Sequence, residues 1–220
     1  MQPFRQLRSV AAPLPDADID TDIIFPARFL VLTQKAGLGP YAFYEKRFDD
    51  QGRERLDFVL HQPRWRDARI LVTGPNFGCG SSREQAPWAL AGLGLRCLIS
   101  TGFGEIFQAN CLNNGLLPIV LPEAEHAQVL AAAQAGQVLE VDLERRVVML
   151  ADGQVIVFPM AERARRSLLE GTDEIQRILL EAGDRIAAFE ARQRETCPWL
   201  HQDVEDATSV CPSPPPLPAP

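Results

Sequence analysis

The sequence predicts an α/β fold, and three observations support this prediction. Two short apolar segments, residues 69–74 and 96–100, flank a stretch with the composition of a helix. The three segments together predict a βαβ unit of minimal length. A second helix-like stretch and a further apolar segment follow within residues 103–121. Residues 138–158 then alternate apolar and polar side chains around Asp152–Gly153, which is typical of a β-hairpin.

The bulk composition is that of one globular domain with an extension. The chain has 220 residues, 46% of them hydrophobic, and a formal net charge of −7. The acidic balance argues against a nucleic-acid or membrane-surface role. No apolar run approaches the roughly 20 residues that span a bilayer, and the first 20 residues lack the apolar core of a signal peptide. We therefore expect a cytoplasmic protein.

The cysteine and histidine pattern predicts no metal centre within this chain. The three histidines are scattered, and no CxxC motif or zinc-like spacing is present. The cysteine count is odd, which argues against a secreted disulfide framework. The five cysteines are Cys79, Cys97, Cys111, Cys197 and Cys211.

Helix boundaries can be expected from local signals. Ser81 or Ser82 is suited to cap a helix with Glu84 and Gln85 in its first turn, and Gly92 or Gly94 would end this helix. The next helix, over about 103–113, would close at Asn114–Gly115, and the strand 116–121 follows.

The later elements complete the predicted order. An alanine-rich helix from residue 123 would end at Gly136. Residues 161–192 have helical spacing, which Gly171 and Gly183 are expected to break into pieces. The proline-rich end predicts disorder, so we divide the chain into a domain at 1–195 and a tail at 196–220.

The stretch "NFGCGSSREQAPWAL", residues 76–90, predicts an anion site. A helix N-terminus presents unpaired backbone N–H groups, and preceding glycines such as Gly80 let the backbone approach a ligand closely. Arg83 can bind a carboxylate or phosphate through two parallel hydrogen bonds, and the hydroxyls of Ser81 and Ser82 can donate as well. A simpler interpretation makes Ser81 a helix cap and Arg83 part of a surface ion pair.

Three familiar patterns do not fit this loop. No lysine follows its glycines, as a Walker A loop requires. Gly78 and Gly80 fit the start of G-x-G-x-x-G, but Arg83 occupies the third glycine position. The G-x-S-x-G elbow is absent, and the histidines offer no obvious base partner for a serine.

A second unusual stretch, "DADIDTDIIFPARFL", covers residues 16–30. Its four aspartates at a period of two would lie on one side of an extended chain. An EF-hand loop counted from Asp18 would need glycine and glutamate where Ile23 and Phe29 stand. A loop rich in Asx turns is the alternative interpretation.

Three motifs together resemble a known family. The strings "DIDTDIIFPARFL", "PNFGCGSSREQAPWAL" and "FGEIFQANCLNNGLLPI" occur in the order and at the separations seen in the small subunit of 3-isopropylmalate dehydratase, within the aconitase superfamily. The resemblance covers about residues 1–195. It implies a swivelling β/β/α domain of the aconitase type, with C-terminal helices. It also implies a separate large subunit, in a heterodimer or heterotetramer, that carries a 4Fe-4S iron–sulfur cluster and most catalytic groups.

The resemblance assigns roles to individual residues. Ser81 takes the place of the catalytic serine that removes the substrate α-proton, and Asp22 matches an active-site aspartate. Ser82 and Arg83, with the Gly80 backbone, would bind a carboxylate of a small dicarboxylate substrate. The neighbouring Asp20 and Thr21 would support the loop.

The sequence departs from the family pattern at two places near these residues. Gln85 replaces the usual histidine, and glutamine cannot carry a charge. In the substrate-selecting loop, Lys35 and Ala36 stand where arginine and threonine are usual. Lysine cannot reproduce the two-pronged hydrogen bonding of arginine, so Lys35 bears on which substrate binds.

The sequence therefore predicts the small subunit of a hydro-lyase that is inactive alone. With its partner it would isomerise 2-isopropylmalate to 3-isopropylmalate in leucine biosynthesis. One alternative keeps the chemistry and changes the substrate, as in a methylmalate/citraconate or homoaconitate type of enzyme. The other is a non-catalytic carboxylate-binding module.

Overall fold

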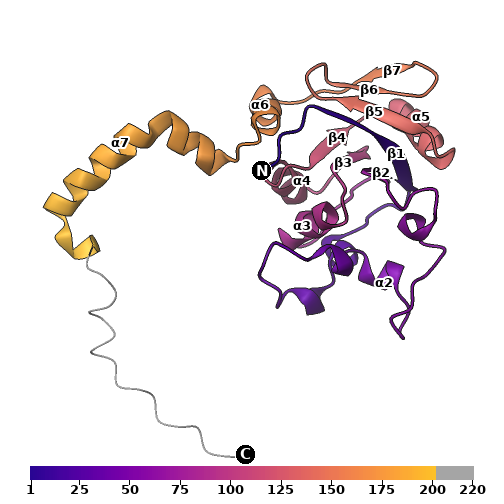
Figure 1. The fold of residues 1–220 in the computed structure, drawn as a ribbon, viewed down its shortest axis with the longest axis horizontal. Helices are drawn as coiled ribbons and strands as arrows, with labels where there is room; N and C mark the ends of the chain where they lie inside the picture. The colour runs from indigo at the N-terminus through magenta and orange to yellow at the C-terminus, as the bar shows by residue number, and fades with distance from the viewer. Residues whose placement is uncertain (202–220) are drawn as a thin grey trace, which may run out of the picture. The chain divides into compact units, whose positions relative to one another are not determined.

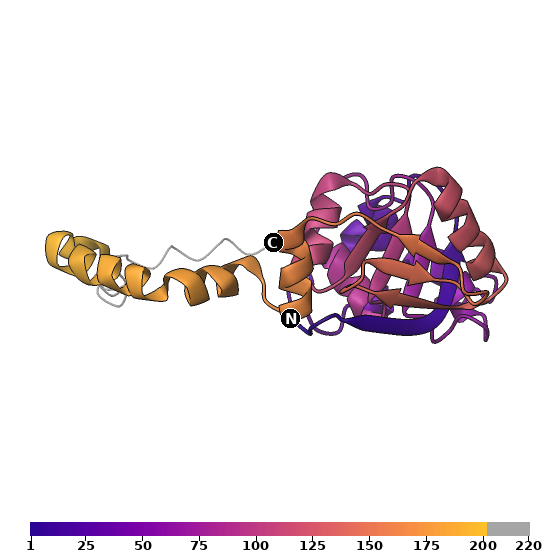
Figure 2. The ribbon, with the colours of Figure 1, turned by 90° about the horizontal axis from the view of Figure 1, so that it is seen from above.

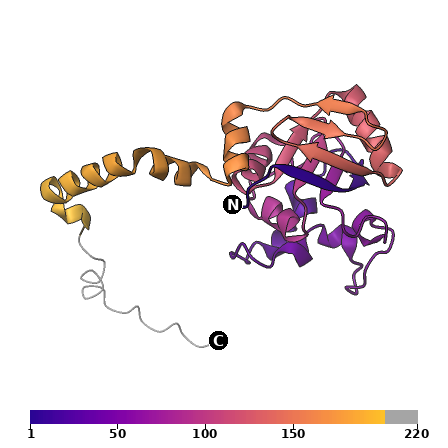
Figure 3. The same ribbon diagram turned by 45° about the horizontal axis from the view of Figure 1, so that its top comes forward.

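A seven-stranded sheet with the order β4-β3-β2-β1-β5-β6-β7 organises the computed structural model, which describes residues 1–201. β1 to β4 pair in parallel, whereas β1, β5, β6 and β7 pair antiparallel. Figures 2 and 3 show the antiparallel strands lying over the parallel ones, so that the sheet is strongly curled. The strands are β1 (Gln6–Leu14), β2 (Ile70–Thr73), β3 (Cys97–Ser100), β4 (Leu117–Val120), β5 (Val138–Asp142), β6 (Val147–Met149) and β7 (Val155–Val157).

Helices cover the sheet on both faces (Figure 1). One buried cluster joins α5 to the face that the antiparallel strands close, and the other joins α3 and α4 to the opposite face. The helices are α1 (Thr21–Ile24), α2 (Tyr44–Arg47), α3 (Gln85–Gly92), α4 (Glu105–Asn113), α5 (Glu123–Gln134), α6 (Glu162–Glu170) and α7 (Glu174–Thr196). Four 3-10 turns are η1 (Ala27–Phe29), η2 (Gly39–Tyr41), η3 (Val59–His61) and η4 (Pro198–His201).

The parallel strands send alternate side chains into the two clusters. In β2, Ile70 and Val72 enter the α5 side, whereas Leu71 enters the α3 side. In β3, Leu98 likewise faces the α3 side. This period-two division explains why the parallel strands β2, β3 and β4 are continuous apolar runs, since both faces of this part of the sheet are buried.

The strand at the centre of the sheet was not among the predicted elements. β1 includes Arg8, Ser9 and Pro13, which are poor strand formers. Its partners on both sides fix it: β1 pairs in parallel with β2 and antiparallel with β5. The hydroxyl of Ser9 also accepts a hydrogen bond from the Arg69 backbone at 2.9 Å, which ties β1 to the start of β2.

Three local predictions need correction. α3 begins at Gln85 with Glu84 at the capping position, so neither predicted serine caps it. The strand predicted before the Asp152–Gly153 turn is two strands, because a further turn separates β5 from β6. Gly171 does end α6, but Gly183 lies inside the continuous α7, since 23 residues tolerate the roughly 1 kcal/mol cost of one glycine.

The chain divides into two compact units, Met1–Glu174 and Ile175–Pro220. The first unit holds the whole sheet, and within the described part of the chain the second holds most of α7 and η4. The predicted domain at 1–195 stays a prediction, and most of the predicted tail at 196–220 lies outside the described residues. Within residues 1–201, no helix combines the length and apolar character needed to cross a bilayer.

Candidate active site

Three loops lie side by side where the parallel strands β1, β2 and β3 end. The loop after β1 bonds to the loop after β2: Gly78 N donates to the Ile19 carbonyl at 2.7 Å, and Thr21 N donates to the Cys79 carbonyl at 2.9 Å. The loop after β3 bonds to the same segment, and Gly104 N donates to Phe77 O at 3.0 Å. The carboxyl edge of parallel strands is where such sheets bind ligands. Residues far apart in sequence therefore meet at one corner.

Glycines allow this close packing of loops. Gly78 has φ +74°, and a Cβ built on it would overlap the ring of Phe107. A Cβ on Gly104 would overlap the carbonyl oxygen of Gly78. At Gly104 backbone packs directly on backbone, and at Gly78 backbone packs directly on an aromatic ring, so neither position has room for a larger side chain.

The four aspartates of residues 16–22 do not share one side of an extended chain, which corrects that prediction. Asp16 forms an ion pair with Lys46 at 2.8 Å. Asp18 has φ +55° and accepts a hydrogen bond from Asn76. Asp22 likewise pairs with Arg83, far along the chain, whereas the Asp20 carboxylate bonds locally to Ile23.

Asp20 and Thr21 form hydrogen bonds that hold the loop after β1. The Asp20 carboxylate accepts a hydrogen bond from Ile23 N at 2.8 Å and so caps α1. The Thr21 hydroxyl is buried and donates to the Ser81 carbonyl at 2.9 Å. These bonds fix the backbone of the "GSSR" segment against the loop that follows β1.

Arg83 and Asp22 form an ion pair at this corner. The Arg83 side chain is 12% exposed and the Asp22 side chain is 51% exposed. The Nη1 atom of Arg83 donates to the Asp22 carboxylate and, at 3.4 Å, to the Phe25 carbonyl. Within residues 1–201, its Nη2 atom has no hydrogen-bond partner. The guanidinium is therefore held in place from one side and can bind a carboxylate through the other.

Gly80, Ser81 and Ser82 are exposed beside this pair. Gly80 has φ +89°, a conformation that presents its backbone openly. Neither serine hydroxyl forms a hydrogen bond to another described residue, so both are free to meet a substrate. Among residues 1–201, no side chain is placed to accept the Ser81 proton. The positive electrostatic potential near the N-terminus of α3 and Arg83 is the feature of this chain that would stabilise a deprotonated Ser81.

Lys35 is tied to α3 and to the end of α4 by a network that the sequence did not predict. Its Nζ donates to Asn114 Oδ1 at 2.5 Å and lies over the Trp88 ring. The same Asn114 oxygen accepts from Trp88 Nε1 at 2.8 Å, and its amide nitrogen donates to Glu84 at 2.8 Å. Asn114 was predicted only as a helix cap. Gln85, the first residue of α3, is half-buried and adjoins this network.

The surroundings of Cys79, the cysteine at the corner, disfavour its thiolate form. Burial, helped by the nearby negative charges of Asp20 and Asp18, raises the pKa of the Cys79 thiol above its ordinary value. A protonated thiol neither attacks nor binds a metal readily. Within the described residues, no three His, Cys, Asp or Glu side chains gather as metal ligands would.

The fold and the loop corner define a domain of the aconitase C-terminal class. The family model described as the aconitase C-terminal domain matches residues 1–124, and the model for the C-terminal domain of the 3-isopropylmalate dehydratase small subunit matches residues 180–203. The chain belongs to the family of 3-isopropylmalate dehydratase small subunits. The predicted family and fold class are confirmed.

Relatives match nearly the whole chain. The 3-isopropylmalate dehydratase small subunit of Parvibaculum lavamentivorans is 46% identical over 202 residues, covering 91% of this chain and 100% of the relative. That of Rhodospirillum centenum is 48% identical over 201 residues, covering 90% and 98%. A crystal structure of 3-isopropylmalate dehydratase from Methanocaldococcus jannaschii is 26% identical, with a TM-score of 0.59, and covers 84% of this chain and 99% of that one.

Proposed function

We propose that this chain is the small subunit of a 3-isopropylmalate dehydratase. As part of this hydro-lyase it would isomerise 2-isopropylmalate to 3-isopropylmalate by dehydration and rehydration, in leucine biosynthesis. The observation that carries the proposal is the 46–48% identity to such small subunits over about nine tenths of the chain. The exposed "GSSR" corner is where the proposed chemistry would take place.

The proposed roles follow the arrangement at the corner. Ser81 removes the substrate α-proton as an alkoxide-like base, which needs stabilisation of its deprotonated form. Ser82, Arg83 and the Gly80 backbone bind a substrate carboxylate, and the free Nη2 atom of Arg83 supports this role. Asp22 orients Arg83 through their ion pair.

The proposal requires a partner over the corner. Gly80, Ser81 and Ser82 are exposed, so water would surround a reacting group there unless another surface covered it. The large subunit is that partner in the proposal, in a heterodimer or heterotetramer in the cytoplasm. It would hold a 4Fe-4S cluster, which when bound supplies a Lewis acid for the departing hydroxyl. This chain contributes the base, the carboxylate site and the positioning of both.

The test is to express the chain with its large subunit, purify the complex and reconstitute its cluster under reducing conditions. Turnover of 2-isopropylmalate is expected from the complex and from neither subunit alone. No turnover of any alkylmalate would overturn the enzymatic proposal and favour a non-catalytic carboxylate-binding module.

A second candidate keeps the reaction and changes the substrate. It is favoured by Lys35, which stands in the substrate-selecting loop and is bound to Asn114. A lysine held in this way offers a single charge to a ligand rather than a planar pair of donors. Turnover of methylmalate or a homoaconitate-type substrate, but not of 2-isopropylmalate, would replace the first candidate with this one.

A further inference from the structure

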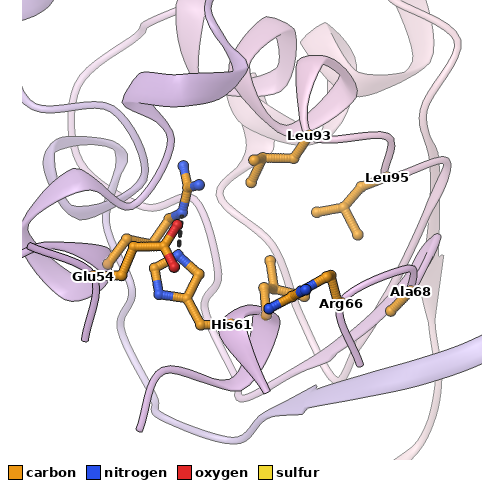
Figure 4. A pocket seen from close by; sticks show the side chains of 8 residues that line it. Glu54, His61, Arg66, Ala68, Leu93 and Leu95 are labelled. Atoms are coloured by element: carbon orange, nitrogen blue, oxygen red, sulfur yellow. Dashed lines mark hydrogen bonds between the residues drawn. The ribbon is translucent and has the colours of Figure 1, made fainter. Parts of the chain in front are cut away.

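Two opposite charges face one cavity without meeting each other (Figure 4). The cavity has a volume of about 430 Å³, within the range of small-molecule sites. Within residues 1–201, Glu54 and Arg66 form no ion pair with each other or with another side chain. The lining residues are Arg47, Glu54, Leu60, His61, Arg66, Ala68, Leu93 and Leu95.

The other two polar residues of the cavity have structural roles. Arg47 Nη1 donates to three carbonyl oxygens of residues 39–42, at 3.1 to 3.2 Å. Its Nε donates to His61 Nε2 at 3.2 Å, and the opposite ring nitrogen of His61 lies 2.9 Å from the Arg55 carbonyl oxygen. His61 therefore accepts on one side and donates on the other, as a neutral imidazole does. Within residues 1–201, these bonds leave Arg47 Nη2 as the one nitrogen of the two side chains without a hydrogen-bond partner.

The negative charge of Glu54 also acts on Arg47. Burial lowers the pKa of Arg47 below its ordinary value, and the Glu54 charge opposes that shift. Glu54 and Arg66 are both exposed, so the charged group of each is accessible to a ligand that enters the cavity.

Aliphatic side chains form the opposite wall. Figure 4 shows Leu93 and Leu95 across the cavity from Glu54, with Arg66 and Ala68 below them. Leu95 and Ala68 are buried and Leu60 and Leu93 are half-buried, so this wall is a fixed part of the core. A ligand that fills the space must therefore present a positive group, a negative group and an apolar group in different directions.

We propose that this cavity binds a small aliphatic α-amino acid in its zwitterionic form. Arg66 binds the carboxylate, Glu54 binds the ammonium group, and the side chain packs on Leu60, Leu93 and Leu95. A carboxylate alone would not use Glu54, and an amine alone would not use Arg66. Two charged contacts and one apolar contact together define the ligand class.

The cavity is separate from the candidate active site. α3 begins beside the Ser81 corner and ends at Gly92, and Leu93 and Leu95 directly follow that end. Eight residues of helix, at about 1.5 Å each, place roughly 12 Å between the two ends. The two sites therefore lie at opposite ends of α3, and the inference goes beyond the proposed function.

The test is calorimetric titration of the full chain with leucine, isoleucine and valine as probes. Saturable binding of at least one of them is expected, and weaker binding of glycine, 4-methylpentanoate and 3-methylbutylamine, each of which lacks one of the three groups. Absence of binding by all three amino acids at about 10 mM would overturn the proposal. Equal binding of 4-methylpentanoate would overturn the zwitterion assignment.

Variants at the two charges test the same assignment. Glu54→Gln and Arg66→Gln should each weaken binding by at least about tenfold, because each removes one charged contact. Arg8→Gln is the matched control, since Arg8 is an exposed arginine on β1 outside the cavity, and it should leave affinity unchanged. Thermal unfolding of all three variants shows whether the fold is kept. Unchanged affinity in both cavity variants would remove the charges from the site.

Discussion

Arg83 lies nearly buried beside the exposed carboxylate of Asp22, and this pairing decides what the corner offers a ligand. A lone buried guanidinium would be costly, whereas a paired one is held ready in a defined orientation. The sequence predicted both residues as site members but not their contact. The ion pair of the simpler interpretation is present and orients Arg83, whereas its binding of a substrate carboxylate stays a proposal.

Removing the Ser81 hydroxyl should abolish most turnover. Ser81→Ala is expected to lower kcat by at least about 10²-fold in the complex, because general-base contributions are of this size. Association with the large subunit should be unchanged, since the Ser81 carbonyl, which Thr21 uses, remains. Steady-state kinetics and co-purification measure the two properties. Ser82→Ala is the matched control and should mainly raise KM; near-normal kcat in Ser81→Ala would show that the base lies elsewhere.

Replacing Lys35 by arginine should move substrate preference toward 2-isopropylmalate. The expected change is in the ratio of kcat/KM for 2-isopropylmalate and methylmalate, by about tenfold, since arginine can bind a carboxylate with two parallel hydrogen bonds. Asn114→Ala releases the Lys35 ammonium without changing its type and serves as comparison. A ratio unaltered by Lys35→Arg would remove this position from the specificity argument.

At the scale of elements, glycine contacts fix the loops to one another. Gly78→Ala is expected to destabilise the fold by at least about 2 kcal/mol, because a Cβ there meets the Phe107 ring and the backbone has positive φ. Gly94→Ala is the matched control: it also has positive φ, at +93°, but open space around it, so about 1 kcal/mol is expected. Urea unfolding measures both. Equal losses of stability in the two variants would mean that the positive φ, and not the contact with the Phe107 ring, accounts for the effect of Gly78→Ala.

The contact between α5 and the end of β2 should make stability depend on pH. His126 Nε2 lies 2.8 Å from the Thr73 carbonyl, and burial lowers the pKa of His126 below its ordinary 6.5, with the hydrogen bond opposing. As pH falls below about 6.5, His126 becomes protonated in the unfolded chain before it does in the folded chain. The free energy of unfolding therefore falls. His126→Gln removes this titration.

The measurement is the free energy of unfolding of both proteins at about pH 7.5 and pH 5.5. The advantage of the original protein over His126→Gln should be larger at the higher pH. An advantage that grows on acidification would contradict the lowered pKa.

Local patterns predicted some elements well and others not at all. α3, α4 and α5 and the strands between them follow from apolar runs and glycine stops within the segment itself. β1 and the four aspartates could not be assigned, because their conformations depend on partners such as β5, Lys46 and Asn76 far along the chain. The Lys35 network is of the same kind, since Asn114 lies 79 residues away.

At the scale of the whole molecule, the first unit should fold without α7. Residues 1–174 contain all seven strands and both buried clusters. A chain truncated after Glu174 is expected to unfold cooperatively with a Tm within about 4 °C of the full chain. Differential scanning calorimetry tests this. Failure of the truncated chain to fold would show that α7 belongs to the same cooperative unit.

A chain ending at residue 195 tests the predicted domain. It should retain association with the large subunit and turnover, because the predicted tail contributes neither. Loss of either property in the chain 1–195, with retention in the full chain, would assign a role to residues 196–220.

The glycine-built corner has a consequence for how a protein of this kind changes over generations. A side chain at Gly78 would meet the Phe107 ring and one at Gly104 would meet the Gly78 carbonyl oxygen, so a substitution at either position displaces a neighbour. The loop that carries Lys35 is exposed, and the Lys35 side chain contacts only flexible neighbours such as the Asn114 amide. In the proposed function, a tightly packed catalytic corner beside an exposed loop would let substrate specificity change while the reaction is inherited unchanged.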